Sequence, residues 1–121
     1  MKETNIIQEK SYAFAIRIVK LSKYLIEEKK EFIYSKQIGR SGTSIGANIE
    51  EAIGGQSEKD FYSKIAISYK ETRETHFWLR LLRDTDYLTA NLAKSLLKDC
   101  DELLKILGAI TRTLKKKLFD S

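Results

Sequence analysis

The chain has 121 residues, of which 42% are hydrophobic and 32% are charged, with no proline, six glycines and one cysteine. A chain of this length forms one domain with a sizeable core. The single cysteine excludes an intramolecular disulfide framework. The composition favours helices. The formal net charge is +5, which keeps acidic partners such as nucleic acids among the candidates.

No stretch approaches the roughly 20 apolar residues that a membrane-spanning helix needs. Residues 1–5 lack the apolar core of a signal peptide, and an unpaired cysteine is typical of a reducing compartment. We therefore expect a single domain over residues 1–121 that lies in the cytoplasm.

A first helix is expected from about residue 5 to residue 28, with Thr4 or Asn5 as its cap. Its core stripe comprises Ile7, Phe14, Ile18, Leu21 and Leu25. A second apolar stripe comprises Tyr12, Ala15, Val19 and Ile26. The helix is therefore either deeply buried or covered on its second stripe by a neighbouring subunit. The remaining face is expected to be solvated charge and carries Arg17, Lys20 and Lys23.

A second helix is expected from residue 32 or 35 to Ile53, where Gly54 and Gly55 supply left-handed conformations that end it. Its middle, residues 40–52, reads RSGTSIGANIEEA. Each interior glycine costs about 1 kcal/mol relative to alanine, so we expect another backbone to approach this helix closely at Gly39, Gly42 and Gly46. A polar line at the edge of the core needs hydrogen-bond partners and comprises Ser41, Ser44, Asn48 and Glu51.

A third helix is expected to begin after Ser57, which can cap it. The middle of its core face carries the hydroxyls of Ser68, Thr72 and Thr75, which we predict as partners for Asn48 and Glu51. The carboxylates of Glu71 and Glu74 are expected to form ion pairs with Lys70, Arg73 or Arg80. Trp78 is interpreted as an anchor in the bundle or at a subunit contact, because stacking platforms for bases usually lie on sheets or loops.

A fourth helix is expected from Ala90 to about Lys117, capped by Thr89. Its apolar residues recur at intervals of four and three, as in a bundle seam: Leu96, Cys100, Leu103, Leu107, Ile110 and Leu114. Cys100 lies on this seam, so we expect a buried and unreactive thiol.

Two motifs resemble the family of 23S ribosomal RNA intervening-sequence proteins, also called the S23 family. The first motif is RSGTSIGANIEEA, and the second is a third-helix pattern in which Phe77 precedes Trp78 and Leu79; together they span about residues 37–82. The resemblance implies an up-down-up-down four-helix bundle that assembles as a homopentamer, with no established biochemical role. The positions that carry it include Arg40, Ser44, Gly46, Asn48, Glu51, Glu71, Glu74 and Trp78.

The sequence lacks the groups that catalysis or metal binding would need. The single histidine, His76, has Arg73 three residues before it, so the Glu-x-x-His pairs of a helical di-metal site are missing. No nucleophile elbow or phosphate-binding loop occurs. We therefore predict a protein that is not an enzyme and that needs no cofactor or metal.

The basic excess lies in the second half of the chain. Residues 1–60 hold ten basic and nine acidic residues, whereas residues 61–121 hold twelve and eight. Much of the excess falls near the C-terminus, and we predict a basic tail without a stripe along the bundle. The predicted function is RNA or DNA binding by a homopentamer through phosphate contacts, with these candidates: Arg112, Lys115, Lys116, Lys117, Lys20 and Lys23. Charge that only favours the helix dipole and solubility is the simpler explanation of the lysine run.

An alternative function is a protein-interaction scaffold, or an accessory subunit of an enzyme that acts on nucleic acid. Its interfaces would be the apolar surplus of the first and third helices and the glycine-rich second helix. The glycine-rich motif is interpreted as a structural crossing, although a small-ligand pocket or a surface along an oligomer axis would suit the same residues.

Overall fold

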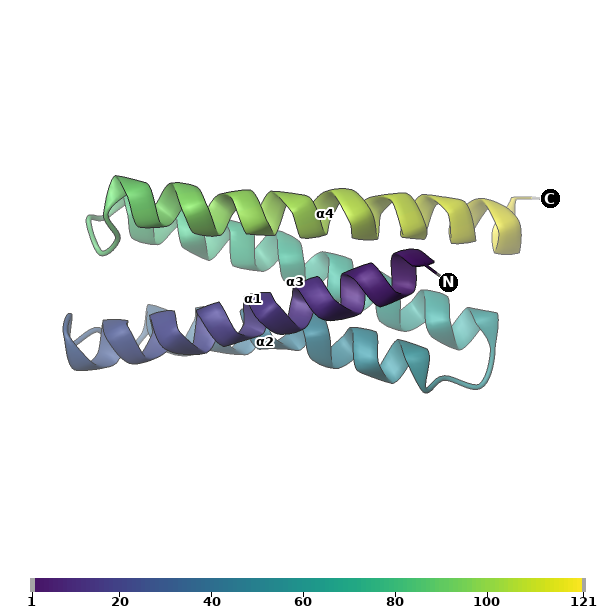
Figure 1. Cartoon of the computed structure of the whole chain (residues 1–121), viewed down its shortest axis with the longest axis horizontal. Coiled ribbons are helices and arrows are strands. Elements are labelled where there is room, and N and C mark those ends of the chain that lie inside the picture. Colours follow the sequence, from purple (N-terminus) through teal and green to yellow (C-terminus); the bar gives the residue numbers. More distant parts are fainter. Residues whose placement is uncertain (1, 121) are drawn as a thin grey trace.

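Four long helices run antiparallel to their neighbours along the chain (Figure 1). The structure is a computed structural model that describes residues 2–120. The helices are α1 (Lys2–Glu27), α2 (Tyr34–Ile53), α3 (Glu58–Asp84) and α4 (Ala90–Phe119). Each packs against the next, and α1 also packs against α4. Because the connections are short, consecutive helices must reverse direction, and both ends of the chain lie at the same end of the bundle.

This arrangement confirms the predicted all-α up-down-up-down bundle. The core contains the predicted stripe of α1 and the predicted seam of α4, including Cys100. Burial raises the pKa of the Cys100 thiol to about 12, which leaves it protonated and unreactive. Among the described residues, no helix is long and apolar enough to cross a membrane.

The three glycines of α2 face α1, but a backbone approaches only Gly46, whereas the prediction placed one at all three. A Cβ atom on Gly42 would lie 2.7 Å from Cγ2 and 2.8 Å from Cγ1 of Ile18. One on Gly46 would lie 3.5 Å from the backbone oxygen of Ser11. The neighbour at Gly46 is thus both the side chain of Ser11, with Oγ at 3.4 Å, and its backbone, whereas the neighbour at Gly42 is a core side chain.

The ends of the helices show which predicted caps form. Ser57 and Thr89 accept hydrogen bonds from the backbone N–H groups of Asp60 and Leu92, at 3.1 and 3.2 Å, which confirms both caps. The prediction for α1 was wrong, because Thr4 and Asn5 lie inside a helix that already includes Lys2.

The start of α2 depends on a residue that the sequence analysis did not identify. Glu31 is only 6% exposed, and its carboxylate accepts hydrogen bonds from the N–H groups of Ile33 (2.9 Å) and Ser35 (2.7 Å). The Ser35 hydroxyl donates back to the Glu31 carbonyl at 2.8 Å. A glutamate therefore fills the role usually taken by a short capping residue.

The prediction that Gly54 and Gly55 end α2 through left-handed backbone was also wrong. No described glycine has a positive φ, and Gly54 has φ −81°. A Cβ on Gly55 would lie 3.1 Å from the Ala52 oxygen, so lack of a side chain is what the turn requires here. The left-handed residues are instead Lys30 (φ 52°) and Asp86 (φ 67°).

The buried hydroxyls of α3 do not serve Asn48 and Glu51, contrary to the prediction. The hydroxyls of Ser68 and Thr75 donate to α2 at the Ile45 carbonyl and the Ser41 hydroxyl, both at 2.9 Å. Asn48 lies further from the core and donates to the carbonyl of Ser44, one turn earlier, at 2.8 Å. Glu51 is exposed and pairs with Lys64 at 2.9 Å.

Candidate nucleic-acid interface

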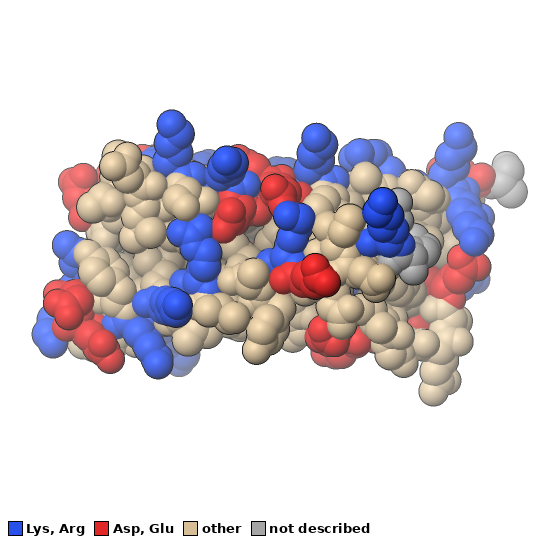
Figure 2. Space-filling view, in the orientation of Figure 1, with Lys and Arg blue, Asp and Glu red and all other residues tan. Residues whose placement is uncertain are grey.

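The basic residues of α4 form a stripe along its outer face. The stripe consists of Lys94, Lys98, Lys105, Arg112 and Lys116, all of which are exposed. Intervals of four and seven residues keep these side chains on one side of a helix. Figure 2 shows blue side chains recurring along the upper edge of the bundle, where α4 lies. The prediction of a basic tail without a stripe was therefore wrong.

Counting charge along the sequence hid this stripe. The helix α4 carries seven basic and three acidic residues, a difference of +4 out of +5 for the chain. Two of its acidic residues pair with α1, Asp99 with Arg17 at 2.6 Å and Glu102 with Lys10. The third, Asp101, lies between Lys98 and Lys105, and its carboxylate is 3.0 Å from Nε2 of His76 on α3. None of the ion pairs found within residues 2–120 includes a stripe residue. The cations of the stripe thus remain available to a partner.

The other predicted cations of α4 differ in their surroundings. Lys115 is exposed beside the stripe, about 100° around the helix from Lys116. Lys117 points to α3, where its Nζ atom lies 2.7 Å from Oε2 of Glu58. Arg112 folds back over Gly108, one turn earlier. Among the predicted residues of the tail, Arg112, Lys115 and Lys116 remain candidates for phosphate contact, whereas Lys117 is already paired.

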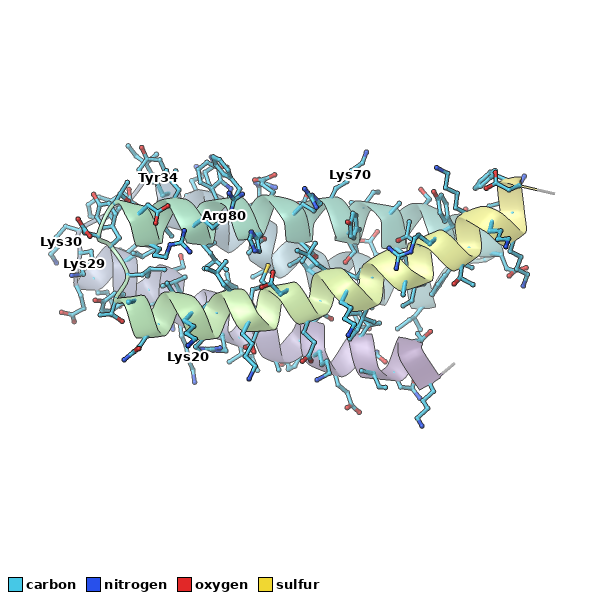
Figure 3. All side chains as sticks on the ribbon, turned by 90° about the horizontal axis from the view of Figure 1, so that it is seen from above. Lys20, Lys29, Lys30, Tyr34, Lys70 and Arg80 are labelled. Atoms are coloured by element: carbon cyan, nitrogen blue, oxygen red, sulfur yellow. The ribbon has the colours of Figure 1, made fainter. Side chains whose placement is uncertain are left out.

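Basic residues of α1 and α3 flank the stripe on both sides. In Figure 3 Lys20 projects on the α1 side of α4, and Arg80 lies on its α3 side. Lys20 shares a surface pocket with Arg17, Leu92 and Leu96, between α1 and α4. On the opposite flank, Arg83 shares a pocket with Lys94 and Lys98. The predicted Lys20 therefore belongs to the same surface as the stripe.

Lys23, the remaining predicted cation, lies on a different surface of α1. It follows Val19 by four residues and precedes Ile26 by three, so it shares their exposed face. We call this surface, with Tyr12 and Ile16, the α1 apolar face; Tyr12 is 68% exposed and Val19 44%. The second stripe of α1 is thus not covered within the chain.

Polar residues of the two motifs meet on the surface between α2 and α3. Arg40 pairs with Glu71 (3.2 Å) and with Glu74, and Glu74 also accepts a hydrogen bond from Nε1 of Trp78 at 3.0 Å. The carboxylates of Glu71 and Glu74 were predicted to pair with Lys70, Arg73 or Arg80 of the same helix. This prediction was wrong, because Arg40 of α2 pairs with both carboxylates of α3. The cluster ties α2 to α3 and leaves no carboxylate free for other chemistry.

Trp78 also anchors an aromatic group at one end of this surface. Its ring centroid lies 6.0 Å from that of Tyr34 and 5.0 Å from that of Phe77. We call Ile33, Tyr34, Phe77 and Trp78 the aromatic patch; Phe77 is 47% exposed.

Ser44 donates to the carbonyl of Arg40 at 2.6 Å. Together with Gly46 and Asn48, which serve helix packing and an intrahelical bond, these contacts give the motif residues structural roles.

The groups that could support catalysis are held in ordinary contacts. Arg80 donates to Nδ1 of His76 at 3.0 Å, so Nε2 carries the proton that faces Asp101. Residues 2–120 contain no group of three or more His, Cys, Asp or Glu side chains arranged to hold a metal ion.

A comparison of the sequence with profiles of known families shows which family the chain belongs to. The sequence profile of the 23S rRNA-intervening sequence proteins matches residues 3–109. The chain belongs to this family. The match includes the first three residues of the stripe and ends before Arg112.

A solved structure from the same family supports the fold. It is a protein of unknown function from the S23 ribosomal protein family of Bacteroides thetaiotaomicron VPI-5482. The two sequences are 49% identical, the alignment covers 91% of this chain and 98% of the other, and the TM-score is 0.89. A search of curated protein sequences gave no match.

Proposed function

We propose that this chain is a non-enzymatic nucleic-acid-binding protein that holds phosphates on the α4 stripe. The observation that carries the proposal is a row of exposed cations that, among residues 2–120, have no ion-pair partner and are interrupted by a single carboxylate, Asp101. Lysine and arginine side chains in such a row release counterions from a phosphate backbone when they bind it. The name of the family, which refers to intervening sequences of 23S rRNA, supports a nucleic acid as the partner.

The test compares two variants that lose the same charge. The stripe variant combines Lys94→Gln, Lys98→Gln, Lys105→Gln and Arg112→Gln. The control variant combines Lys29→Gln, Lys30→Gln, Lys36→Gln and Lys59→Gln, all exposed positions outside the stripe and outside the ion pairs of the described chain.

Binding of labelled structured RNA is measured by fluorescence anisotropy at low salt. We expect the stripe variant to bind at least about tenfold more weakly than the wild type, since four phosphate contacts are lost, and the control variant to bind within about threefold. Equal losses in both variants, or no binding by the wild type, would contradict the proposal.

A second proposal concerns assembly: we infer that copies of the chain associate through the α1 apolar face and the aromatic patch. These two surfaces differ in sequence and lie on different helices. A contact between unlike surfaces is heterologous and closes into a ring when the rotation permits. The resemblance implies a ring of five. Such a ring would bring five α4 stripes together and strengthen the positive field. It would also serve the alternative function, a scaffold for a protein partner.

Solution mass tests the assembly. The monomer has a mass of 14.0 kDa, and we expect the wild type at micromolar concentration to have a multiple of this mass. Val19→Glu places a charge in the α1 apolar face and should shift the protein toward the monomer, whereas Thr113→Glu on exposed α4 should not. Circular dichroism spectra of both variants serve as the control for folding. A wild-type protein that is monomeric at about 100 μM would contradict the inference.

A further inference from the structure

The stripe is a ridge of charge along one helix, with no channel around it. Lys94 and Lys116 are 22 residues apart, which is about 33 Å along an α-helix. The intervals between successive cations are about 6 or 10 Å. The surface therefore presents five separated cations along a line, and Figure 2 shows blue side chains spaced along this edge with red ones between them.

The outer face of α4 offers no aromatic side chain for base stacking. The only aromatic residue in α4 is Phe119, in its last turn, and its ring packs on Tyr62 with the centroids 5.3 Å apart. Small or acidic residues such as Asp101 and Ala109 lie between the cations. Proteins that bind single strands combine positive charge with aromatic platforms, and stacking contributes much of their affinity. The stripe has the charge without the platforms.

A duplex presents regularly spaced phosphates, which are the groups that the cations of the stripe can bind. Over about 33 Å a duplex of the B type presents roughly ten base pairs and close to twenty phosphates, all at fixed spacing. Lys20 on one flank and Arg80 on the other widen the basic surface to the sides of the ridge (Figure 3). Cations on both sides of the stripe can contact the phosphates of two strands at once.

We propose that the ligand of the stripe is double-stranded nucleic acid, held by phosphate contacts over about ten base pairs without base readout. This inference rests on the proposed function, because it names the class of nucleic acid that the same surface binds.

The experiment compares a 20-base-pair DNA duplex with each of its separate strands, under one salt condition and with one label. We expect the duplex to bind at least about tenfold more tightly than either strand, and a 6-base-pair hairpin stem to bind much more weakly than the 20-base-pair duplex. The stripe variant should lose the preference for the duplex, while the control variant retains it. Unlabelled polyglutamate is added as a competitor and should displace little of the duplex at equal charge concentration.

The outcomes separate this inference from the proposed function. If single strands bind as tightly as the duplex and the stripe variant binds neither, the duplex inference fails and the proposed function stands. If no nucleic acid binds, both fail. Displacement of the duplex by polyglutamate at equal charge concentration would overturn the duplex inference in favour of an acidic protein partner.

Discussion

At the scale of single residues, Gly42 marks the closest approach between α1 and α2. Its hydrogen occupies the place where a methyl group would lie under 3 Å from two carbons of Ile18. Gly39, one turn earlier, faces only the Ser22 hydroxyl, at 3.4 Å from a Cβ built on it. The two glycines share a helix but differ in the space around them.

We therefore predict opposite effects for two alanine substitutions. Gly42→Ala should destabilise the protein, because overpacking costs about 1–3 kcal/mol and exceeds the gain in helix propensity. Gly39→Ala should be neutral or stabilising by up to about 1 kcal/mol. The measurement is the urea midpoint of each variant, and equal shifts in the two variants would show that contact with Ile18 is not what requires Gly42.

The buried carboxylate of Glu31 makes stability depend on pH. Burial alone raises the pKa of this group, but hydrogen bonds from the backbone N–H groups of Ser35, Ile33 and Tyr34 outweigh it and hold the pKa below its usual value. Since the folded chain binds this proton less readily than the unfolded chain, the stabilisation is complete above about pH 4.3 and is lost as the pH falls through the folded pKa.

Glu31→Gln should therefore lower the free energy of unfolding by about 1–2 kcal/mol at pH 7, because hydrogen bonds to a charged acceptor are stronger. The difference from the wild type should shrink as the pH falls below the unfolded pKa of about 4.3 and the wild-type carboxylate takes up a proton. Chemical denaturation at pH 7 and at an acidic pH measures it. A difference that stays constant between them would mean that the charge of Glu31 contributes nothing to the cap.

At the scale of the helices, hydroxyl groups join α2 to α3 in the core. Ser68 is fully buried, and its hydroxyl donates across the interface to the Ile45 carbonyl. Ser68→Ala should cost about 1 kcal/mol through the lost hydrogen bond. Ser63→Ala, at an exposed position of the same helix, should cost nothing. The thermal midpoints of the two variants test this, and equal midpoints would assign the bond no net contribution.

Periodicity predicted the helices and their buried faces, because apolar residues recur every three or four positions along each helix, as they do around Phe14 in α1 and Leu103 in α4. It could not predict the ends that depend on chain reversal. Glu31 becomes a cap only when the backbone turns back onto its carboxylate, and Asp86 adopts a left-handed conformation that the sequence does not signal with glycine.

The candidate site was predicted in part. Arg112, Lys115, Lys116 and Lys20 belong to the basic surface or lie beside it, while Lys117 does not. Lys94, Lys98 and Lys105 were missed because charge was counted along the chain. Plotting the same residues at 100° intervals around α4 would have found the stripe.

At the scale of the whole molecule, the basic and apolar surfaces lie on different helices. The stripe follows α4, whereas the α1 apolar face and the aromatic patch lie on α1 and at the junction of α2 with α3. Self-association through the apolar surfaces therefore leaves the stripe exposed to solvent. Assembly and phosphate binding can occur in the same particle.

The most direct test of the stripe is the salt dependence of duplex DNA binding for single substitutions. Log affinity should fall linearly with log salt concentration, with a slope of about −4 to −5 if five cations contact phosphates. Lys105→Gln should reduce the magnitude of this slope by about 1. Lys117→Gln should leave it unchanged, because Lys117 is paired with Glu58. A slope near zero for the wild type, or the same change for both substitutions, would contradict phosphate binding by the stripe.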